Sequence, residues 1–198
     1  MAEREPFRDD DPCQNPALAP LCPRVERMVS AERFEHIGRV VRQAEAIALA
    51  NGFTRADADA VCLAALLHDV ARDLAPDELF RLAPPQNAVE ERQPLSVHGR
   101  AARVIASSWG VEDERVLAAI EGHVFGVGLD NRIGMAVYIA DVCEPGRGVN
   151  EDIRELAMQD LAQAYQEAVG SKVRYLRSQG KSVHPATLEV YEQICHPT

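Results

Sequence analysis

The sequence predicts an all-α protein, a bundle of about seven helices. Two observations support this prediction. Apolar residues recur at helical spacing in long windows without proline, and the alternating polar and apolar runs typical of strands are nearly absent. The chain has 198 residues, of which 46% are apolar. A chain of this size and composition is expected to form one domain and to bury its core without a disulfide framework or a structural metal.

Each predicted helix has local signals of its own. The first ends at Asn51-Gly52, a typical C-terminal stop. The second begins after Thr54, whose hydroxyl suits an N-cap, and ends before Pro76. Its centre, residues 60–67, is apolar on every side, which predicts a buried central helix. Further helices are expected over residues 96–109, 112–121, 133–142, 156–178 and 185–194.

The first 24 residues differ in composition from the rest of the chain. They hold five of the twelve prolines and the acidic cluster Asp9-Asp10-Asp11, and they have no helical periodicity. We therefore expect a disordered leader over residues 1–24 and a folded domain over residues 25–198. The five cysteines are scattered without a Cys-x-x-Cys pair, so we expect them to be reduced, with no thiolate zinc site.

The charge of the chain excludes two classes of partner. Asp and Glu total 31 against 21 Lys and Arg, a formal net charge of −10, which repels nucleic acid and anionic membranes. No stretch approaches the roughly 18 to 20 apolar residues of a membrane span, and the N-terminus lacks the pattern of a signal peptide. We expect a cytoplasmic protein. A small phosphorylated ligand is still allowed where basic residues gather.

The chemistry is expected where two apolar helices each end in an aspartate. Asp69 follows His68 after the eight apolar residues 60–67, and Asp141 ends the mostly apolar run 133–140. A carboxylate at the edge of a core is costly unless a partner compensates for its burial. Three more histidines stand near helix ends in the same part of the sequence: His36, His98 and His123.

These six residues predict a two-metal centre. Neutral imidazole and carboxylate suit iron, manganese or zinc, and six such ligands exceed what one open catalytic ion needs. Asp69 has two oxygens and can bridge two ions, which would stabilise the attacking and leaving oxygens of a phosphoryl displacement. Each histidine taken alone is more simply interpreted as a core residue. The order of all six is the specific signal.

The order His, His-Asp, His, His, Asp is the signature of the HD-domain metal-dependent phosphohydrolases, and the chain resembles the YqeK family among them over residues 25–194. The resemblance implies an HD-domain helical bundle that acts as a symmetrical bis(5′-nucleosyl)-tetraphosphatase. Such a phosphoric anhydride hydrolase cleaves diadenosine tetraphosphate to two ADP by attack of a metal-activated water. The segments that carry the resemblance are RFEHIGRVVRQA, AALLHDVARDL, SVHGRAA, IEGHVFG, YIADVCEPGR and GKSVHPATLEVYE.

The resemblance also implies roles for individual residues around two iron ions, for which manganese or zinc are alternatives. One ion would be held by His36, His68, Asp69 and Asp141, and the other by Asp69, His98 and His123. Asp69, His98, His123 and Arg147 would be catalytic, and the guanidinium of Arg147 offers a planar fork of donors to phosphate. The implied nucleotide contacts are His98, Gly99, Arg100, Ala101, Arg147, Gly180, Lys181, Ser182, Val183, His184 and Pro185.

Two positions depart from the family pattern. Val124-Phe125 stands where the family has two threonines, which removes hydroxyl donors, and Arg72 stands where it commonly has lysine. Arg72 stays protonated, so it is unsuited to proton transfer, and the sequence identifies no general acid. Two alternatives stay open. One is a phosphohydrolase for another nucleotide, such as a deoxynucleotide, a guanosine polyphosphate alarmone or a cyclic dinucleotide. The other is a nucleotide-binding regulator with low turnover. A homodimer is open as well.

Overall fold

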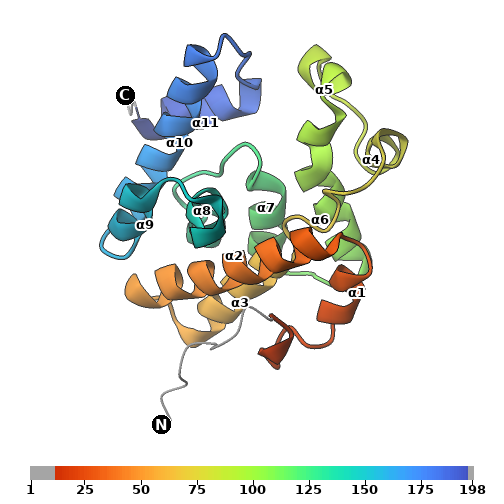
Figure 1. Ribbon diagram of the computed structural model, residues 1–198, viewed down its shortest axis with the longest axis vertical. Coiled ribbons are helices and arrows are strands. Elements are labelled where there is room, and N and C mark those ends of the chain that lie inside the picture. Colours follow the sequence, from red (N-terminus) through yellow and green to blue (C-terminus); the bar gives the residue numbers. More distant parts are fainter. Residues whose placement is uncertain (1–11, 196–198) are drawn as a thin grey trace.

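The computed structural model describes residues 12–195, and all regular structure in this part of the chain is helical (Figure 1). The predicted all-α bundle is therefore confirmed. Three 3-10 helices accompany the α-helices: η1 (Pro12–Gln14), η2 (Pro94–Val97) and η3 (Pro145–Arg147). The α-helices are α1 (Cys22–Glu26), α2 (Ala31–Ala50), α3 (Arg55–Leu67), α4 (Pro76–Leu82), α5 (Ala88–Arg92), α6 (His98–Ser108), α7 (Glu114–Gly122), α8 (Arg132–Cys143), α9 (Glu151–Ala157), α10 (Leu161–Ser178) and α11 (Pro185–Cys195).

The described residues form eleven α-helices, against about seven predicted, because several are short. Helices α1, α4, α5 and α9 have five to seven residues each, too few to show clear periodicity. The segment predicted as one helix over 156–178 contains the end of α9 and all of α10. Asp160 separates them, because its carboxylate accepts from the amide of Gln163 and caps α10. Helix α3 ends at Leu67, earlier than predicted, and the chain continues in turns.

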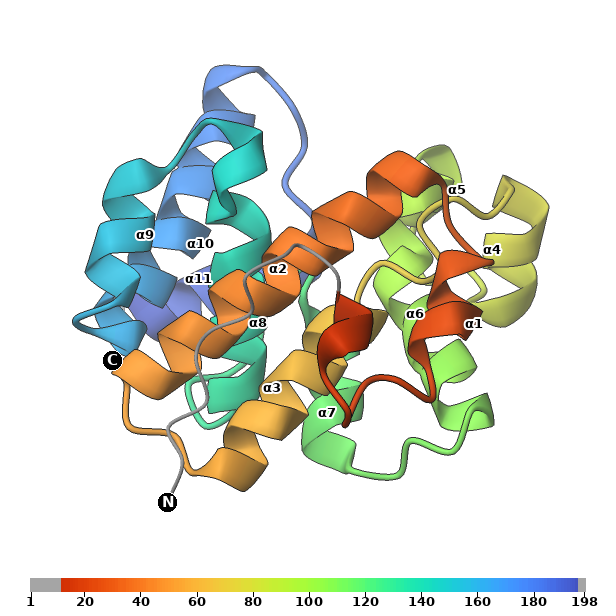
Figure 2. The same cartoon turned by 60° about the horizontal axis from the view of Figure 1, so that its bottom comes forward.

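Helices α2, α3 and α8 form the centre of the molecule (Figure 2). Residues 133–140 of α8 are all buried, and residues 64–67 of α3 are fully buried, which confirms the predicted buried central helix. Helices α6 and α7 pack on each other, with α7 against α3 and α8, while α10 packs against α8, α9 and α11. No described helix has the length and apolar character needed to cross a membrane.

Residues 12–24 differ from the disordered leader expected there. They form η1 and the start of α1 and pack on the core, with Leu18 and Cys22 fully buried. Each helix has a proline in its first turn, Pro12 in η1 and Pro23 in α1, where the missing amide hydrogen has no partner inside the helix. Residues 1–11, including the acidic cluster, lie outside the described residues.

The expectation that all cysteines are reduced is wrong for Cys13 and Cys22. The turns between η1 and α1 bring their Cα atoms to 5.4 Å, and the two side chains form a disulfide. Their spacing gave no sign of this, because the disulfide joins η1 to α1 and the sequence analysis predicted neither helix. Cys62 and Cys143 are buried.

Replacing Cys13 and Cys22 together by serine is expected to lower the free energy of unfolding by about 2–3 kcal/mol, because the cross-link restricts the unfolded chain. Denaturant unfolding of the oxidised wild type and the double variant measures the difference. Reduced wild type is the control and should match the variant. Equal stability of the oxidised and reduced wild type would contradict the prediction.

Candidate metal centre

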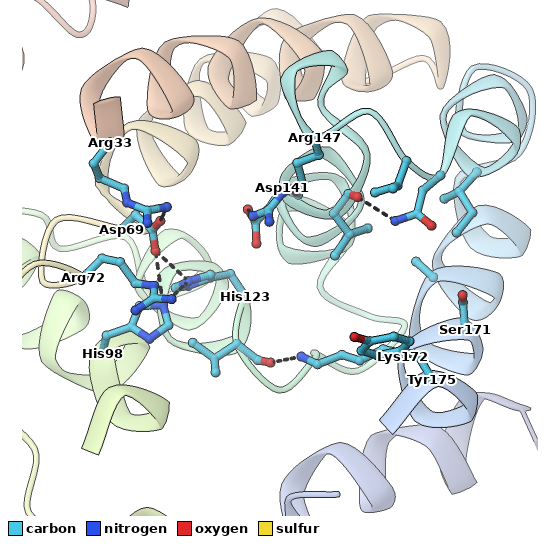
Figure 3. Close-up of a pocket in the computed structure, with 16 residues that line it drawn as sticks. Arg33, Asp69, Arg72, His98, His123, Asp141, Arg147, Ser171, Lys172 and Tyr175 are labelled. Carbon is cyan, nitrogen blue, oxygen red and sulfur yellow. Dashed lines mark hydrogen bonds and ion pairs between the residues drawn. The ribbon is translucent and has the colours of Figure 1, made fainter. Parts of the chain in front are cut away.

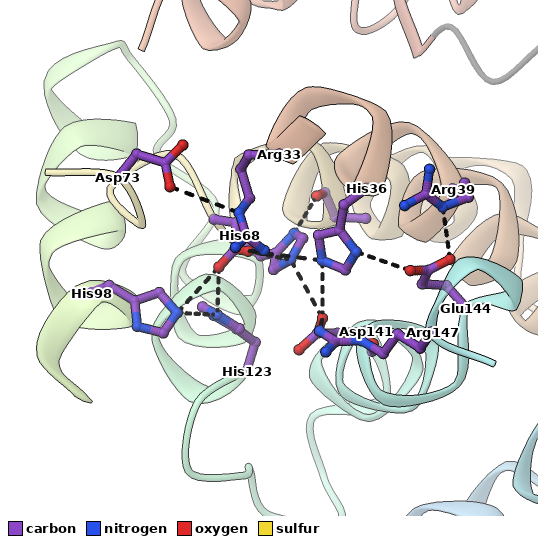
Figure 4. A network of polar contacts seen from close by, with 12 residues as sticks. Arg33, His36, Arg39, His68, Asp73, His98, His123, Asp141, Glu144 and Arg147 are labelled. Carbon is purple, nitrogen blue, oxygen red and sulfur yellow. Dashed lines mark hydrogen bonds and ion pairs between the residues drawn. The ribbon is translucent and has the colours of Figure 1, made fainter. Parts of the chain in front are cut away.

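The six residues predicted as metal ligands converge at one place, brought there by five helices (Figure 4; Asp69 is labelled in Figure 3). His36 lies on α2, and His68 and Asp69 follow the last residue of α3. The other three come from later helices: His98 begins α6, His123 follows α7, and Asp141 lies in the last turn of α8. All six are within contact distance of other members of the set.

Asp69 lies between two groups of histidines. Its Oδ2 is 3.8 Å from Nε2 of His36 and 3.6 Å from Nε2 of His68. Its Oδ1 is 3.1 Å from Nε2 of His98 and 3.5 Å from Nε2 of His123. One carboxylate therefore presents each of its oxygens to a different pair of imidazoles. Asp141 completes the first group, with its Oδ1 3.2 Å from Nε2 of His36.

The orientation of each ring is fixed through its Nδ1. In His68, His98 and His123 this atom is 2.6–2.7 Å from the carbonyl oxygen three residues earlier in the chain. In His36 it is 3.2 Å from Oε1 of Glu144, a residue that the sequence analysis did not single out. Since carbonyl and carboxylate oxygens only accept, each Nδ1 donates and each Nε2 carries a lone pair toward the centre.

The lone pairs have no protein donor to satisfy them. Nε2 of His36 and Nε2 of His68 are buried and make no hydrogen bond within the described residues. Nε2 of His98 is 2.9 Å from Nε2 of His123, and two lone pairs at this distance repel each other unless a cation lies near both. Nitrogen and carboxylate donors in this arrangement fit divalent transition metals, and the groups His36, His68, Asp141 and His68, Asp69, His123 are each compact enough to hold an ion.

Burial and charge keep these residues in the protonation states that metal ligands need. Burial lowers the pKa of His68 to about 4 and lowers the pKa of His98 as well, so both rings are neutral at pH 7. Burial alone would raise the pKa of Asp69, but the facing His68 and its other histidine neighbours outweigh it and hold that pKa well below its usual range. The pKa of Asp141 is lowered in the same way, by His36 foremost.

Three arginines balance the acidic groups. Arg33 donates to Oδ2 of Asp69 at 2.9 Å, and Arg39 donates to Oε2 of Glu144 at 2.8 Å. Arg147 donates to the carboxylate and to the backbone carbonyl of Asp141, so it lies beside this predicted metal ligand, as the sequence suggested. The sequence analysis missed Arg33 and Arg39, although both stand three residues from His36 on one face of α2.

A cavity of about 730 Å³ opens beside the histidines (Figure 3). One wall holds metal-centre residues, and the other is formed by Ser171, Lys172 and Tyr175 of α10. This wall was not predicted, since α10 looks like an ordinary amphipathic helix in the sequence. The volume suits an organic phosphate of nucleotide size. Predicted site residues that line the cavity are Asp69, His98, His123, Asp141 and Arg147.

The other implied nucleotide contacts do not line this cavity. Arg100 is paired with the buried carboxylate of Glu90 at 2.6 Å. His184 lies 3.1 Å from the same carboxylate and stacks on Phe125, with ring centroids 3.8 Å apart. Their role in binding stays a prediction, as does that of the remaining residues: Gly99, Ala101, Gly180, Lys181, Ser182, Val183 and Pro185.

The fold and the site together define a helical protein built around a buried cluster of histidines and aspartates that could hold metal ions. Residues 33–146 match the HD domain, more than half of the chain, and the chain belongs to the HD domain family. A crystal structure from Clostridium acetobutylicum, described as a predicted HD superfamily hydrolase involved in NAD metabolism, is similar with a TM-score of 0.78 and 25% identity, covering 88% of this chain and 94% of that one.

Two relatives have more specific descriptions. A Mycoplasma genitalium protein described as a probable nicotinate-nucleotide adenylyltransferase/Ap4A hydrolase is 32% identical over 155 residues, which is 73% of this chain. This chain spans only 43% of that relative's length. A Bacillus subtilis protein described as a symmetrical bis(5′-nucleosyl)-tetraphosphatase is 29% identical over 177 residues, covering 86% of this chain and 93% of the relative.

Gly99 holds α6 close to α7, because a Cβ there would lie 2.5 Å from the carbonyl oxygen of Glu121. Replacing Gly99 by alanine is expected to push the two helices apart, separate His98 from His123, and lower the free energy of unfolding by about 1–3 kcal/mol. Metal content and denaturant unfolding measure both effects. Alanine at the exposed Ser107 of the same helix is the control, and unchanged metal content in the Gly99 variant would contradict the prediction.

The free energy of unfolding of the metal-free protein is expected to fall by about 2 kcal/mol between pH 7 and pH 5. Unfolded His68 takes up a proton near its ordinary pKa of 6.5, whereas the buried ring stays neutral down to about pH 4. The unfolded state therefore binds more protons as the pH falls, which favours unfolding. Denaturant titrations in a chelator test this. A His68→Gln variant should show a flatter pH profile, and an equally steep one would refute the assignment.

Proposed function

We propose that this protein hydrolyses dinucleoside polyphosphates, with diadenosine tetraphosphate as substrate and two ADP as products. The observation that carries the proposal is the position of Asp69, with one oxygen facing His36 and His68 and the other facing His98 and His123, beside a cavity lined with cations. Relatives described as symmetrical bis(5′-nucleosyl)-tetraphosphatases support the choice of substrate. The net charge of −10 accords with a small substrate in place of nucleic acid, and we place the protein in the cytoplasm.

Two ions, iron by resemblance, would occupy this centre. His36, His68, Asp69 and Asp141 would hold one, and Asp69, His98 and His123 the other. When bound, such a pair supplies Lewis acidity for the phosphoryl group and lowers the pKa of water.

The arginines of the cavity provide the remaining charge stabilisation. Arg147 donates to Asp141, and Arg33 donates to Asp69. Both arginines also line the cavity. Both present guanidinium groups where the negative charge of a polyphosphate would gather during displacement. Arg72 also lines the cavity, half-buried. The leaving ADP is a stable anion that these cations can hold, so cleavage of the anhydride does not require a general acid.

The proposal is tested by turnover of diadenosine tetraphosphate by purified, iron-loaded protein, with the nucleotides separated by ion-exchange chromatography. We expect ADP alone as product, no turnover after removal of metal by a chelator, and a rate lower by more than about 100-fold in an Asp69→Ala variant, since even residues around metal ligands contribute 10- to 100-fold. Asp77→Ala, which removes an exposed carboxylate on α4, should keep full activity. AMP plus ATP as products, or an intact substrate, would refute the proposal. A panel of deoxynucleotides, guanosine polyphosphates and cyclic dinucleotides would then identify a different substrate.

A further inference from the structure

Lys172 lies in the middle of α10, on the wall of the cavity opposite Asp69 and His98 (Figure 3). Its side chain is half-buried, and its ammonium donates to the backbone carbonyl of Val124, the residue after the metal-centre histidine His123. The same ammonium lies 5.4 Å from the centre of the Tyr138 ring. A lysine of the outer helix layer is thereby fixed with its charge at the cavity, close to the metal centre.

No direct ion pair neutralises the charge of Lys172 within the described residues, although the carboxylate of Asp141 acts on it from a distance. Arg33 and Arg147, which line the same cavity, are paired with Asp69 and Asp141, whereas Lys172 forms no ion pair with any carboxylate in residues 12–195. Its contacts are a carbonyl oxygen and an aromatic face, which stabilise a cation without cancelling its charge. Taking such a group out of water is costly. Burial lowers the pKa of Lys172 to about 8, so the ammonium is still mostly charged at pH 7.

The ammonium has a donor left for a ligand. It carries three N–H groups, of which one is used by the Val124 carbonyl. The side chain of Val124, which also lines the cavity, has no hydrogen-bond donor, and Ser171 and Tyr175 offer only neutral hydroxyls, so Lys172 supplies the charged donor of the α10 wall. A neutral donor would tie α10 to the Val124 carbonyl equally well, so this hydrogen bond does not account for the positive charge, and the contact with Tyr138 at 5.4 Å offsets only part of the cost of burying it. An anion in the cavity accounts for it.

We propose that Lys172 binds a phosphate group of the substrate on the α10 side of the cavity and so contributes to the preference for a polyphosphate chain. This inference rests on the proposed function for the identity of the substrate. It assigns the two walls different tasks: the metal-centre wall holds the phosphate that reacts, and the α10 wall holds another phosphate of the chain.

The test compares ADP binding by calorimetry in the metal-loaded wild type, Lys172→Met, Lys172→Arg and Arg174→Met. Methionine keeps the length of the side chain and removes its charge, while arginine keeps the charge. Arg174 lies on the same helix, exposed and paired with Glu167 outside the cavity, so Arg174→Met is matched for the loss of one charge. Metal content and melting temperature are measured for every variant.

We expect Lys172→Met to weaken ADP binding roughly 10- to 100-fold, the range for a lost hydrogen bond to a charged group. Arginine should restore most of the affinity, Arg174→Met should bind as the wild type does, and metal content should be equal in all four proteins. With diadenosine tetraphosphate as substrate, Lys172→Met should raise KM more than it lowers kcat.

Wild-type ADP affinity in Lys172→Met would overturn the inference. So would a loss of ADP affinity that accompanies a loss of metal, because Lys172 would then act only by placing Val124 and His123. Failure of the proposed function would give a different result. The wild type would then leave diadenosine tetraphosphate intact, whatever the effect of Lys172 on ADP binding.

Discussion

The structure depends on how one buried carboxylate, that of Asp69, is compensated. Its side chain is almost fully buried, and an ionised carboxylate in that position is unstable without groups that oppose its charge. Arg33 pairs with it directly, and four imidazoles direct their Nε2 lone pairs to the same place, so a cation held among them would compensate its charge. These residues come from helices that are far apart in the sequence. Helices α2, α3, α6 and α7 must therefore meet at one point. The fold around the centre is the arrangement that lets them do so.

Backbone carbonyls at helix ends orient three of the histidine rings. The last carbonyls of a helix have no partner inside it and must be satisfied in another way. His68 and His123 are the residues that directly follow α3 and α7, and His98 directly follows η2. Each donates from Nδ1 to a carbonyl of the last turn before it. The same hydrogen bond uses a carbonyl of the helix end and turns Nε2 toward Asp69, so three helix ends each place an imidazole at the centre.

The sequence was sufficient to predict which six residues meet at the centre, because their signal lies in the residue types and their order along the chain. An aspartate after eight apolar residues is conspicuous, and the order of six histidine and aspartate residues along an all-helical chain is rarely met by chance. What the sequence could not predict depends on contacts between distant segments. Lys172 is one of several basic residues in α10 until the fold places it at the cavity, and Arg100 looks available for phosphate until Glu90 is found beside it. Cys13 and Cys22 become a pair only when the turns between them are formed.

In the segment after His123, the contacts that hold the backbone do not involve the side chains of Val124 and Phe125. Tyr165 of α10 donates to the carbonyl of Val127 at 2.8 Å, and Lys172 donates to that of Val124, so this segment is attached to α10 through its backbone. Gly126 has a φ of +108°, and a Cβ there would lie 2.9 Å from the Tyr165 hydroxyl, which explains why glycine is required. Since the backbone and the glycine hold the segment, the side chains of Val124 and Phe125 are free to differ from the family pattern without moving His123. Of these two side chains, Val124 lines the cavity, so a substitution there would alter the cavity wall next to His123.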